Sequence, residues 1–309
     1  MDGDRYDILV VTGPTASGKT AFAARLASSV GGEIISADSR QVYRGMNIGT
    51  GKDYDDYYVD GKKIPCHLID IVDPGYRYNV YEYQRDFFRV YNELKDRKVL
   101  PVVCGGSGMY LDSIISTYKL IKVPVNERLR ESLAGRSLAE LAGILSSYKT
   151  LHNISDVDNA KRAIRAIEIE EYYVRNKVPD DEFPEIRPLI LGISFDREAR
   201  RRRISERLES RLQSGMVEEV KSLLNSGVPF EDLIYYGLEY KYISLCIRGD
   251  ISYDEMKHKL ETAIHRFAKR QMTWFRGMEK RGIKIHWLDG HHDMEQKLEQ
   301  AGDLLELID

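Results

Sequence analysis

The chain has 309 residues, 42% of them hydrophobic and 31% charged, which describes a globular protein large enough for one domain with an insertion or for two domains. No apolar run reaches the roughly 20 residues that span a bilayer, no secretory leader is evident, and three scattered cysteines form no disulfide framework, so we expect a cytoplasmic protein without a membrane span. The formal net charge of −3 gives no overall affinity for nucleic acid, so RNA binding would need local basic patches.

The first predicted element is a strand over 7–12, followed by a Gly-rich loop and by a helical pattern over 21–30. The loop consists of Gly13, Pro14, Thr15, Ala16, Ser17, Gly18, Lys19 and Thr20. It matches the phosphate-loop pattern G-x-x-x-x-G-K-[ST], in which backbone N–H groups and a helix N-terminus surround an anion. Lys19 would add a positive charge and Thr20 a hydroxyl for Mg²⁺. The loop predicts a di- or triphosphate site, and both nucleoside triphosphates and prenyl diphosphates remain open.

A second strand is predicted over 33–36, and Asp38 comes shortly after it. Ligands of open α/β sheets bind at the carboxyl ends of the strands, so we expect Asp38 in the crevice that the phosphate loop lines. The alternative is a turn-forming Asp38 that hydrogen-bonds to its own backbone. The position beside the phosphate loop favours a role in the site.

Residues 44–65 are rich in Gly, Asp, Tyr and Lys without a clear period, which predicts an extended surface loop. A third strand is predicted over 65–72. His67, Asp70 and Asp73 could suggest a metal site, but their spacing fits alternate faces of a strand plus a turn better.

Asn79 and Glu82 resemble a capping box at the start of a helix whose aromatic and aliphatic stripe we expect in the core. A central strand is predicted over 98–104. The Gly-rich turn 105–108 follows it and should face the same crevice. The turn could serve either close helix–sheet packing or close approach to a ligand.

The region from about 116 to 185 shows little strand signal and is predicted to be a helical insertion. Its helical patterns cover 126–133, 137–146 and 155–174. Within the last pattern, Lys161, Arg162 and Arg165 share one helix face. Such a face is usually only solvated, so a binding role stays open.

A strand over 188–195 returns the chain to the sheet, and an arginine-rich helical pattern continues from Arg197 through Leu224. Arginines on a helix that begins at a strand end could line an anionic site. Farther on, 263–276 interleaves Lys269 and Arg270 with aromatic residues, which suits an RNA surface as well as a solvated basic helix face. A short last strand is predicted over 284–288.

These elements predict an α/β protein. Its core would be a P-loop NTPase-like fold with a mostly parallel sheet, formed by 1–115 and 187–309, and 116–186 would be a helical insertion domain.

Taken together, the motifs resemble those of the tRNA dimethylallyltransferase family, also called tRNA isopentenyltransferases. The resembling segments, in the family's order and across nearly the whole chain, are 13–20, Asp38 to Tyr43, Gly45 to Thr50, His67 to Ile71, 105–108, Arg162 to Glu168, Arg203-Ile204 with Arg207, Glu218 to Val220, Tyr236 to Glu239 and Lys269 to Phe275. The combination is highly specific, although several segments alone are not.

The resemblance implies transfer of a dimethylallyl group from dimethylallyl diphosphate to the exocyclic amine of the adenine immediately 3′ of the anticodon in tRNA. The phosphate loop would hold the diphosphate with Mg²⁺ at Thr20, and Asp38 would be the general base. Arg207, favoured over Arg203, would meet the diphosphate. ATP would then not be a substrate.

The resemblance also implies how the tRNA anticodon stem-loop is bound. Residues expected to contact the tRNA are Asp38, Ser39, Arg40, Gln41, Ser107, Lys161, Arg162, Arg165, Lys269 and Arg270. The chain departs from the family pattern at Ser107 and Met109, at Cys66 and at Arg211, where the family commonly has Met. Ser107 retains a hydroxyl, so its contact is expected to persist.

Three other functions compete with this hypothesis. A phosphate-loop kinase of a small metabolite would need a strand-end carboxylate for Mg²⁺, for which Asp70 is a poor candidate. Prenyl transfer to free AMP would not need the basic segment 269–276 or the helical insertion. The third alternative is a non-enzymatic RNA-binding module. We expect a monomer.

Overall fold

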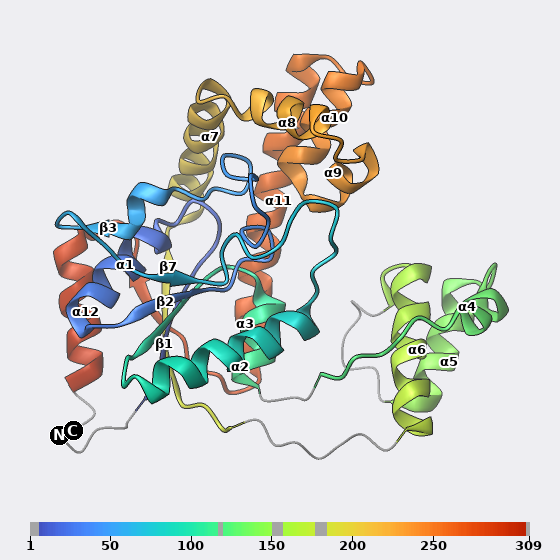
Figure 1. Ribbon diagram of the computed structural model, residues 1–309, viewed down its shortest axis with the longest axis horizontal. Helices are drawn as coiled ribbons and strands as arrows, with labels where there is room; N and C mark the ends of the chain where they lie inside the picture. Colours follow the sequence, from blue (N-terminus) through green and yellow to red (C-terminus); the bar gives the residue numbers. More distant parts are fainter. Residues whose placement is uncertain (1–5, 117–119, 150–156, 177–183, 307–309) are drawn as a thin grey trace. The chain divides into compact units, whose positions relative to one another are not determined.

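The computed structural model describes residues 6–116, 120–149, 157–176 and 184–306 (Figure 1). The chain folds into two compact units: Met1–Tyr118 together with Pro184–Asp309, and Lys119–Phe183. The second unit falls within the predicted insertion, 116–186. Within the described ranges, no helix combines the length and the apolar character needed to cross a bilayer.

The first unit is built on a six-stranded sheet with the order β5-β2-β6-β1-β7-β8. The strands are β1 (Ile8–Thr12), β2 (Glu33–Ser36), β5 (Cys66–His67), β6 (Pro101–Cys104), β7 (Pro188–Ser194) and β8 (His286–Asp289). Every pair of neighbouring strands is parallel, so helices must cover both faces, and the central strands β1 and β6 are accordingly buried along their whole length. The predicted α/β class with a phosphate-loop core is confirmed.

The strand register aligns the carboxyl ends of three neighbouring strands. Val11 pairs with Cys104, and Cys104 also pairs with Ser36. β1, β2 and β6 therefore end at the same level, and the loops that follow them leave the sheet together. This alignment places the phosphate loop, Asp38 and the turn 105–108 close together at the carboxyl ends of these strands.

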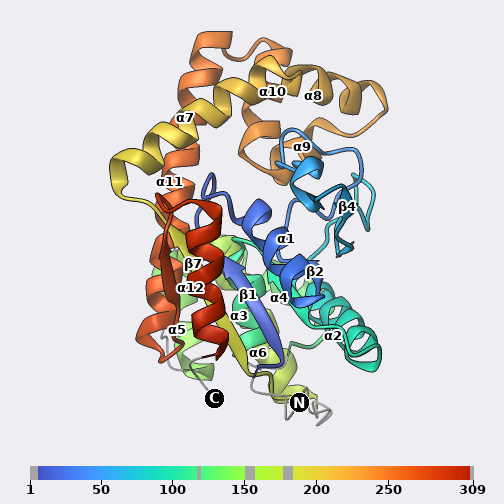
Figure 2. The ribbon, with the colours of Figure 1, turned by 90° about the vertical axis from the view of Figure 1, so that its left-hand side faces the viewer.

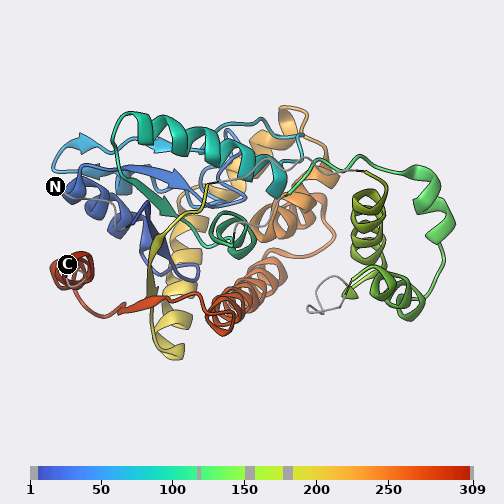
Figure 3. The same cartoon turned by 90° about the horizontal axis from the view of Figure 1, so that it is seen from below.

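Helices pack on both faces of the sheet. The helices of this unit are α1 (Lys19–Val30), α2 (Val80–Asp96), α3 (Gly108–Ile115), α7 (Arg197–Gln213), α8 (Met216–Asn225), α9 (Phe230–Tyr236), α10 (Leu238–Arg248), α11 (Tyr253–Lys280) and α12 (Met294–Glu306). Seen from below (Figure 3), α1 and α12 lie on one side of the sheet, and α3 and α11 lie on the other. The predicted capping box of α2 is present, because Asn79 caps Glu82 N–H and the Glu82 side chain returns to Asn79 N–H.

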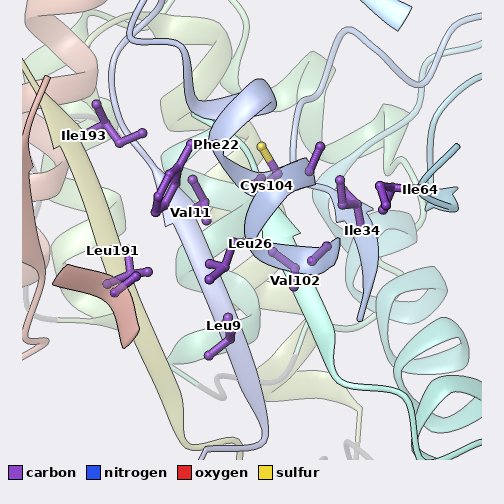
Figure 4. Close-up of a cluster of buried hydrophobic side chains, with 14 of the residues drawn as sticks. Leu9, Val11, Phe22, Leu26, Ile34, Ile64, Val102, Cys104, Leu191 and Ile193 are labelled. Atoms are coloured by element: carbon purple, nitrogen blue, oxygen red, sulfur yellow. The ribbon is translucent and has the colours of Figure 1, made fainter. Parts of the chain in front are cut away.

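The core between the sheet and α1 explains why the phosphate loop is held firmly. Phe22 and Leu26 of α1 pack over Leu9 and Val11 of β1 and over Val102 of β6 (Figure 4). All five side chains are at most 2% exposed. Burying this much apolar surface fixes the helix that begins at the end of the loop.

Helices α7, α8, α9 and α10 gather above one end of the sheet (Figure 2). α7 begins shortly after β7 ends, so this is the carboxyl end of the strands. The single helical pattern predicted from Arg197 through Leu224 is wrong in one respect. Gly215, with φ 95°, separates α7 from α8, since its left-handed backbone is incompatible with a continuous helix.

Two further predictions need correction. The segment 44–65 is not a plain surface loop: it contains a 3₁₀ turn (Tyr54–Tyr57) and an antiparallel pair, β3 (Tyr58–Val59) with β4 (Lys62–Lys63), and several of its side chains are buried. The strand predicted over 65–72 is only β5, because Leu68 and Asp70 have positive φ angles of 59° and 54° that end the extended backbone.

The second unit is helical, with α4 (Glu127–Leu133), α5 (Leu138–Tyr148) and α6 (Ala160–Arg175). Its own small core contains Leu141 and Leu145 of α5 and Ala163 and Ile167 of α6. The helix predicted over 155–174 begins in the structure at Ala160, and residues 155 and 156 lie outside the described part of the chain.

Candidate active site

The phosphate loop joins β1 to α1 through backbone conformations that its glycines allow. Gly13 and Gly18 have φ angles of 150° and 78°, and a Cβ atom at Gly13 would lie 2.5 Å from the carbonyl oxygen of Ile193. Gly18 is the N-cap of α1, and no side chain of the described ranges caps this helix. The first N–H groups of α1 are therefore available to an anion, and the first turn carries no acidic residue.

Gln271 of α11 ties the phosphate loop to the Gly-rich turn. Its Oε1 accepts a hydrogen bond from the N–H of Thr15 at 2.9 Å, and its Nε2 donates to the carbonyl oxygen of Gly106 at 2.9 Å. Gly106 has no side chain, and a Cβ atom there would lie 2.5 Å from Gln271 Nε2. A Cβ at Gly108 would lie 2.3 Å from Trp274. In this structure the turn serves close packing against α11.

Three cations gather beside the loop. Burial lowers the pKa of Lys19, and the guanidinium groups of Arg207 and Arg211 lower it further against the opposing charge of Asp38. Burial, with Arg207 as a like-charged neighbour, lowers the pKa of Arg211 to about 10. A pocket at this place is lined by Thr15 and Ala16 of the loop, by both arginines and by Glu239. Cations crowded in this way favour binding of a multiply charged anion.

Two buried polar atoms of the site have no hydrogen-bond partner in the described residues: Ser17 Oγ in the loop and Arg211 Nη2. Buried polar atoms are nearly always hydrogen-bonded, so such exceptions call for an explanation. Phosphate oxygens are acceptors that both groups could use.

Arg203 and Arg207 contact different parts of the site. Arg203 Nε donates to the carbonyl oxygen of Ala16 at 2.9 Å, and its guanidinium stacks on Phe195 at 4.5 Å. Arg207 Nη2 lies 2.7 Å from Asp53 Oδ2 and lines the pocket. Arg203 therefore supports the loop, whereas Arg207 faces the space that a ligand would use.

Asp38 follows β2 and is half-buried at the same edge of the sheet. Its Oδ1 accepts a hydrogen bond from the N–H of Arg40 at 2.9 Å, so the turn-forming contact considered from the sequence is present. Oδ2 has no hydrogen-bond partner in the described residues. Ser107 Oγ accepts from the N–H of Ser39 at 3.0 Å and lies 3.3 Å from Ser39 Oγ. One carboxylate oxygen thus fixes the turn, and the other is free for a substrate.

Glu219 of α8 fixes the loop 47–53, which contacts Arg207. Its carboxylate accepts hydrogen bonds from the N–H groups of Asn47, Ile48 and Gly49 at 2.7–3.0 Å, and from the Tyr240 hydroxyl at 2.7 Å. This holds Gly51 and Asp53 against α7. Gln41, 8% exposed, donates to the carbonyl oxygen of Gly51 at 3.0 Å, so it supports the same loop.

Within the described residues, no group of three His, Cys, Asp or Glu side chains could hold a metal ion by itself. His67 pairs with Glu33, Asp70 with Lys52, and Asp73 with Arg44, which agrees with the structural roles favoured from the sequence. Thr20 offers a hydroxyl oxygen at the start of α1. Mg²⁺ at phosphate sites usually takes one or two protein oxygens together with phosphate oxygens, so Thr20 fits this ion.

Comparisons with known proteins identify the family. The family model described as IPP transferase matches residues 41–278, and the one described as Isopentenyl transferase matches residues 6–65. A Bacteroides fragilis protein named tRNA dimethylallyltransferase 2 is 61% identical over 293 residues, covering 95% of this chain and 96% of its own. The chain belongs to the tRNA dimethylallyltransferase family.

Two further members agree with this assignment. A Phocaeicola vulgatus protein named tRNA dimethylallyltransferase 2 is 59% identical over 302 residues, which are 98% of each chain. The crystal structure of a full-length tRNA isopentenylpyrophosphate transferase from Bacillus halodurans superposes with a TM-score of 0.71 at 27% identity, covering 96% of this chain and 95% of that one.

In this member of the tRNA dimethylallyltransferase family, the predicted residues fall into three places. The phosphate loop, Asp38 and Arg207 gather at the carboxyl edge of the sheet, and Ser39 and Ser107 join them there. Lys269 and Arg270 are exposed on α11, with Arg270 beside the exposed ring of Phe267, whereas Phe275 is buried in the core. The mixed basic and aromatic segment is thus partly core.

The third place is the helical unit, which is described by itself. Lys161 and Arg162 are exposed on α6, and Arg162 pairs with Asp158 at 2.9 Å. Arg165 instead pairs with the buried Glu168 and donates to the carbonyl oxygen of Val123 at 2.9 Å. Arg165 therefore has structural partners that a role in tRNA binding would have to share.

Sequence reasoning missed Gln271, Glu219 and the full environment of Arg211. Gln271 and Glu219 lie inside segments that carry the family resemblance, and this resemblance was the one sequence feature that could have marked them as functional. Their contacts join residues far apart in the chain, such as Gln271 with Thr15, and no local pattern encodes them.

Proposed function

We propose that the protein transfers a dimethylallyl group from dimethylallyl diphosphate to the exocyclic amine of the adenine 3′ of the anticodon in tRNA, releasing diphosphate. The observation that carries this proposal is a phosphate loop with three nearby cations beside the carboxylate of Asp38. The cations suit a leaving diphosphate, and the carboxylate suits an amine that must lose a proton. A site for diphosphate alone would not need the carboxylate.

Departure of the diphosphate is the first part of the chemistry. The allylic carbon–oxygen bond breaks with positive charge developing on carbon, and its electron pair goes to the diphosphate oxygen. Lys19, the N–H groups at the start of α1, and Arg207 would stabilise the negative charge as it grows. Mg²⁺ held by Thr20 and phosphate oxygens would supply further charge stabilisation.

Attack by the adenine amine is the second part. An aromatic amine is a poor nucleophile until its proton begins to leave, and a carboxylate within hydrogen-bond reach can accept that proton as the carbon–nitrogen bond forms. Oδ2 of Asp38 would take this proton, because Oδ1 is occupied by the N–H of Arg40. Ser39 and Arg40 would hold the base after it leaves the anticodon-loop stack. Gln41, whose buried amide donates to the carbonyl oxygen of Gly51, would assist by holding the adjoining loop in place.

Binding of tRNA would use basic surfaces on both units. Lys269 and Arg270 are exposed on α11, and Lys161 and Arg162 are exposed on α6. Their side chains would meet phosphates of the anticodon stem-loop. Ser107 would contact the tRNA beside Ser39, and Arg165, which also pairs with Glu168, would add a further contact. We also propose that the enzyme is a monomer, and tRNA as substrate supports a cytoplasmic location.

The test is direct transfer. Purified protein is incubated with unmodified tRNA and dimethylallyl diphosphate, and the nucleosides are analysed by mass spectrometry; prenylated adenosine at the position 3′ of the anticodon is expected. Titration with ATP and with dimethylallyl diphosphate separately addresses the kinase alternative. Asp70, the only strand-end carboxylate considered for a kinase, is occupied by Lys52 and Tyr54. Binding of ATP alone, or transfer to AMP but not tRNA, would overturn the proposal.

A further inference from the structure

Arg211 lies on the same face of α7 as two arginines that already contact the site. Arg203, Arg207 and Arg211 occur at every fourth position of the helix and therefore share one face. Arg203 donates to the phosphate loop at the carbonyl oxygen of Ala16. Arg207 and Arg211 line the pocket that the loop residues Thr15 and Ala16 also line. The helix thus directs a row of guanidinium groups at the phosphate site.

Arg211 lacks the partners that a buried arginine normally has. Its side chain is 14% exposed, and its Nη2 atom makes no hydrogen bond in the described residues. The nearest carboxylate oxygen, Asp53 Oδ2, is 3.7 Å from Nη2, which is too far for a hydrogen bond, and it lies 2.7 Å from Arg207. A buried donor without a hydrogen bond is unfavourable, so an anion that accepted a hydrogen bond from Nη2 would relieve this cost.

Glu239 does not provide the missing partner. It lines the same pocket, but within the described residues it forms no ion pair with Arg211. Burial raises the pKa of Glu239, which weakens its carboxylate as a counter-charge. Lys19 and Arg207 add like charge nearby. Arg211 therefore has two like-charged neighbours, and no carboxylate of the described residues lies within hydrogen-bond distance of its Nη2.

The neighbouring loop leaves space for this guanidinium. Gly51 has a φ angle of 71°, and a Cβ atom there would lie 1.9 Å from Arg211 Nη2 and 2.8 Å from Arg207 Nη2. A side chain at position 51 would push both arginines away from their present places. Glu219 holds the preceding residues of this loop by their N–H groups, so the space is maintained by a defined contact.

We propose that Arg211 binds the leaving diphosphate together with Arg207, as a second guanidinium of the catalytic site; this inference rests on the proposed function. Each guanidinium presents a planar set of N–H donors that matches phosphate oxygens. As the carbon–oxygen bond breaks, the electron pair moves onto the diphosphate, and Arg211 donates hydrogen bonds to oxygens whose negative charge increases. Arg211 keeps its proton throughout, and the amine proton goes to Asp38.

The experiment compares R211M with R202M. Both substitutions remove one positive charge from α7, but Arg202 is exposed and outside the pocket. Affinity for inorganic diphosphate and for dimethylallyl diphosphate is measured by isothermal titration. Loss of a charge-assisted hydrogen bond should weaken both ligands roughly 10- to 100-fold in R211M and leave them unchanged in R202M. Affinity for tRNA should stay the same in both variants.

Thermal unfolding distinguishes binding from packing. Because Arg211 is buried and its Nη2 makes no hydrogen bond in the described residues, R211M should unfold at the same temperature as the unmodified protein or at a higher one. R211K, which keeps the charge but loses the planar fork, should recover part of the diphosphate affinity. Unchanged diphosphate affinity in R211M, with a lower unfolding temperature, would show a packing role and overturn the inference.

Failure of the proposed function gives a different pattern. The unmodified protein could transfer nothing to tRNA while R211M binds diphosphate more weakly than the unmodified protein does. In that case the proposed function fails and the diphosphate role of Arg211 stands. If transfer is normal and R211M binds diphosphate as well as the unmodified protein does, only the inference fails.

Discussion

Arginines have different partners in the phosphate site and in the helical unit. In the helical unit, Arg130 and Arg165 both pair with Glu168, whose side chain is 1% exposed and also accepts the N–H of Asn126. In the phosphate site, Arg211 is 14% exposed and its Nη2 has no hydrogen-bond partner among the described residues. A buried carboxylate thus pairs with two partly exposed arginines in the helical unit, whereas the buried Arg211 of the phosphate site has Asp53 Oδ2, 3.7 Å away, as its nearest carboxylate oxygen.

The difference separates charges that hold the fold from charges that await a ligand. Burial alone would raise the pKa of Glu168, but hydrogen bonds from Arg130, the Asn126 N–H and Arg165 outweigh it and hold that pKa below its usual range. Burial instead lowers the pKa of Arg211, and Arg207 adds to this effect. A satisfied pair is part of the folded structure, whereas an unsatisfied cation is stabilised only when an anion binds.

The largest effect is expected from Asp38, which belongs to the phosphate-site region but carries the opposite charge. Asp38→Ala should lower kcat by roughly 10²- to 10⁴-fold, the usual contribution of a general base, with little change in tRNA affinity. Single-turnover transfer and a tRNA binding titration measure the two quantities. Equal losses of kcat and of tRNA affinity would make Asp38 a binding residue and not a general base.

Removing the carboxylate of the helical unit tests the other side of the comparison. Glu168→Gln leaves Arg130 and Arg165, which are 37% and 39% exposed, without their buried counter-charge. Because solvent compensates part of this loss, the free energy of unfolding of that unit should fall by about 1–3 kcal/mol. Hydrogen exchange of the α6 amides in the full chain measures it. Asp158→Asn, in the exposed pair with Arg162, is the matched control and should change stability by at most about 1 kcal/mol. Similar protection in both variants would contradict the structural role of Glu168.

The Glu168 pair should also give the helical unit an acid sensitivity. Because the folded-state pKa of Glu168 is lowered, its contribution to stability is present above the unfolded pKa of about 4.3 and is lost as pH falls through the folded pKa. The protection factors of the α6 amides, which correct for the intrinsic pH dependence of exchange, should fall in that acidic range. The fall should be smaller in Glu168→Gln, which cannot titrate. An identical pH profile of the protection factors would assign the sensitivity to another group.

A smaller effect is expected from Gln271, which joins the phosphate loop to the turn after β6. Gln271→Ala removes the hydrogen bonds to Thr15 and Gly106 and should raise the KM for dimethylallyl diphosphate about tenfold, since the loop loses its support. Gln213→Ala, at an exposed position of α7, is the control. Steady-state kinetics at saturating tRNA would decide, and an unchanged KM would show that the loop holds its shape without Gln271.

The smallest effects concern the exposed cations of α11. Lys269→Ala and Arg270→Ala should each reduce the slope of log tRNA affinity against log salt by about 1, because each removes one phosphate contact, and neither should change affinity for diphosphate. Binding titrations at several salt concentrations measure the slope. A parallel loss of diphosphate affinity would extend the phosphate site beyond Lys19, Arg207 and Arg211.

Local sequence determined the elements and the chemical type of the site. The phosphate loop, the capping box at Asn79 and the parallel strands could be read from the chain, because turn residues, caps and apolar periodicity act over a few neighbouring residues. The position of Asp38 beside the loop also followed, since parallel strands present their carboxyl ends at one edge.

Tertiary structure alone decided which side chains support the loop and which stay free for a ligand. Glu219 binds the N–H of Asn47, which is far from it in the chain. Gln271 joins Thr15 to Gly106, and no local sequence pattern links these two residues. Arg165 and Arg211 are both arginines on helices, yet only Arg165 meets a buried carboxylate. The sequence gives each arginine its charge, but long-range packing determines whether that charge is paired, and this distinction separates fold from function in this chain.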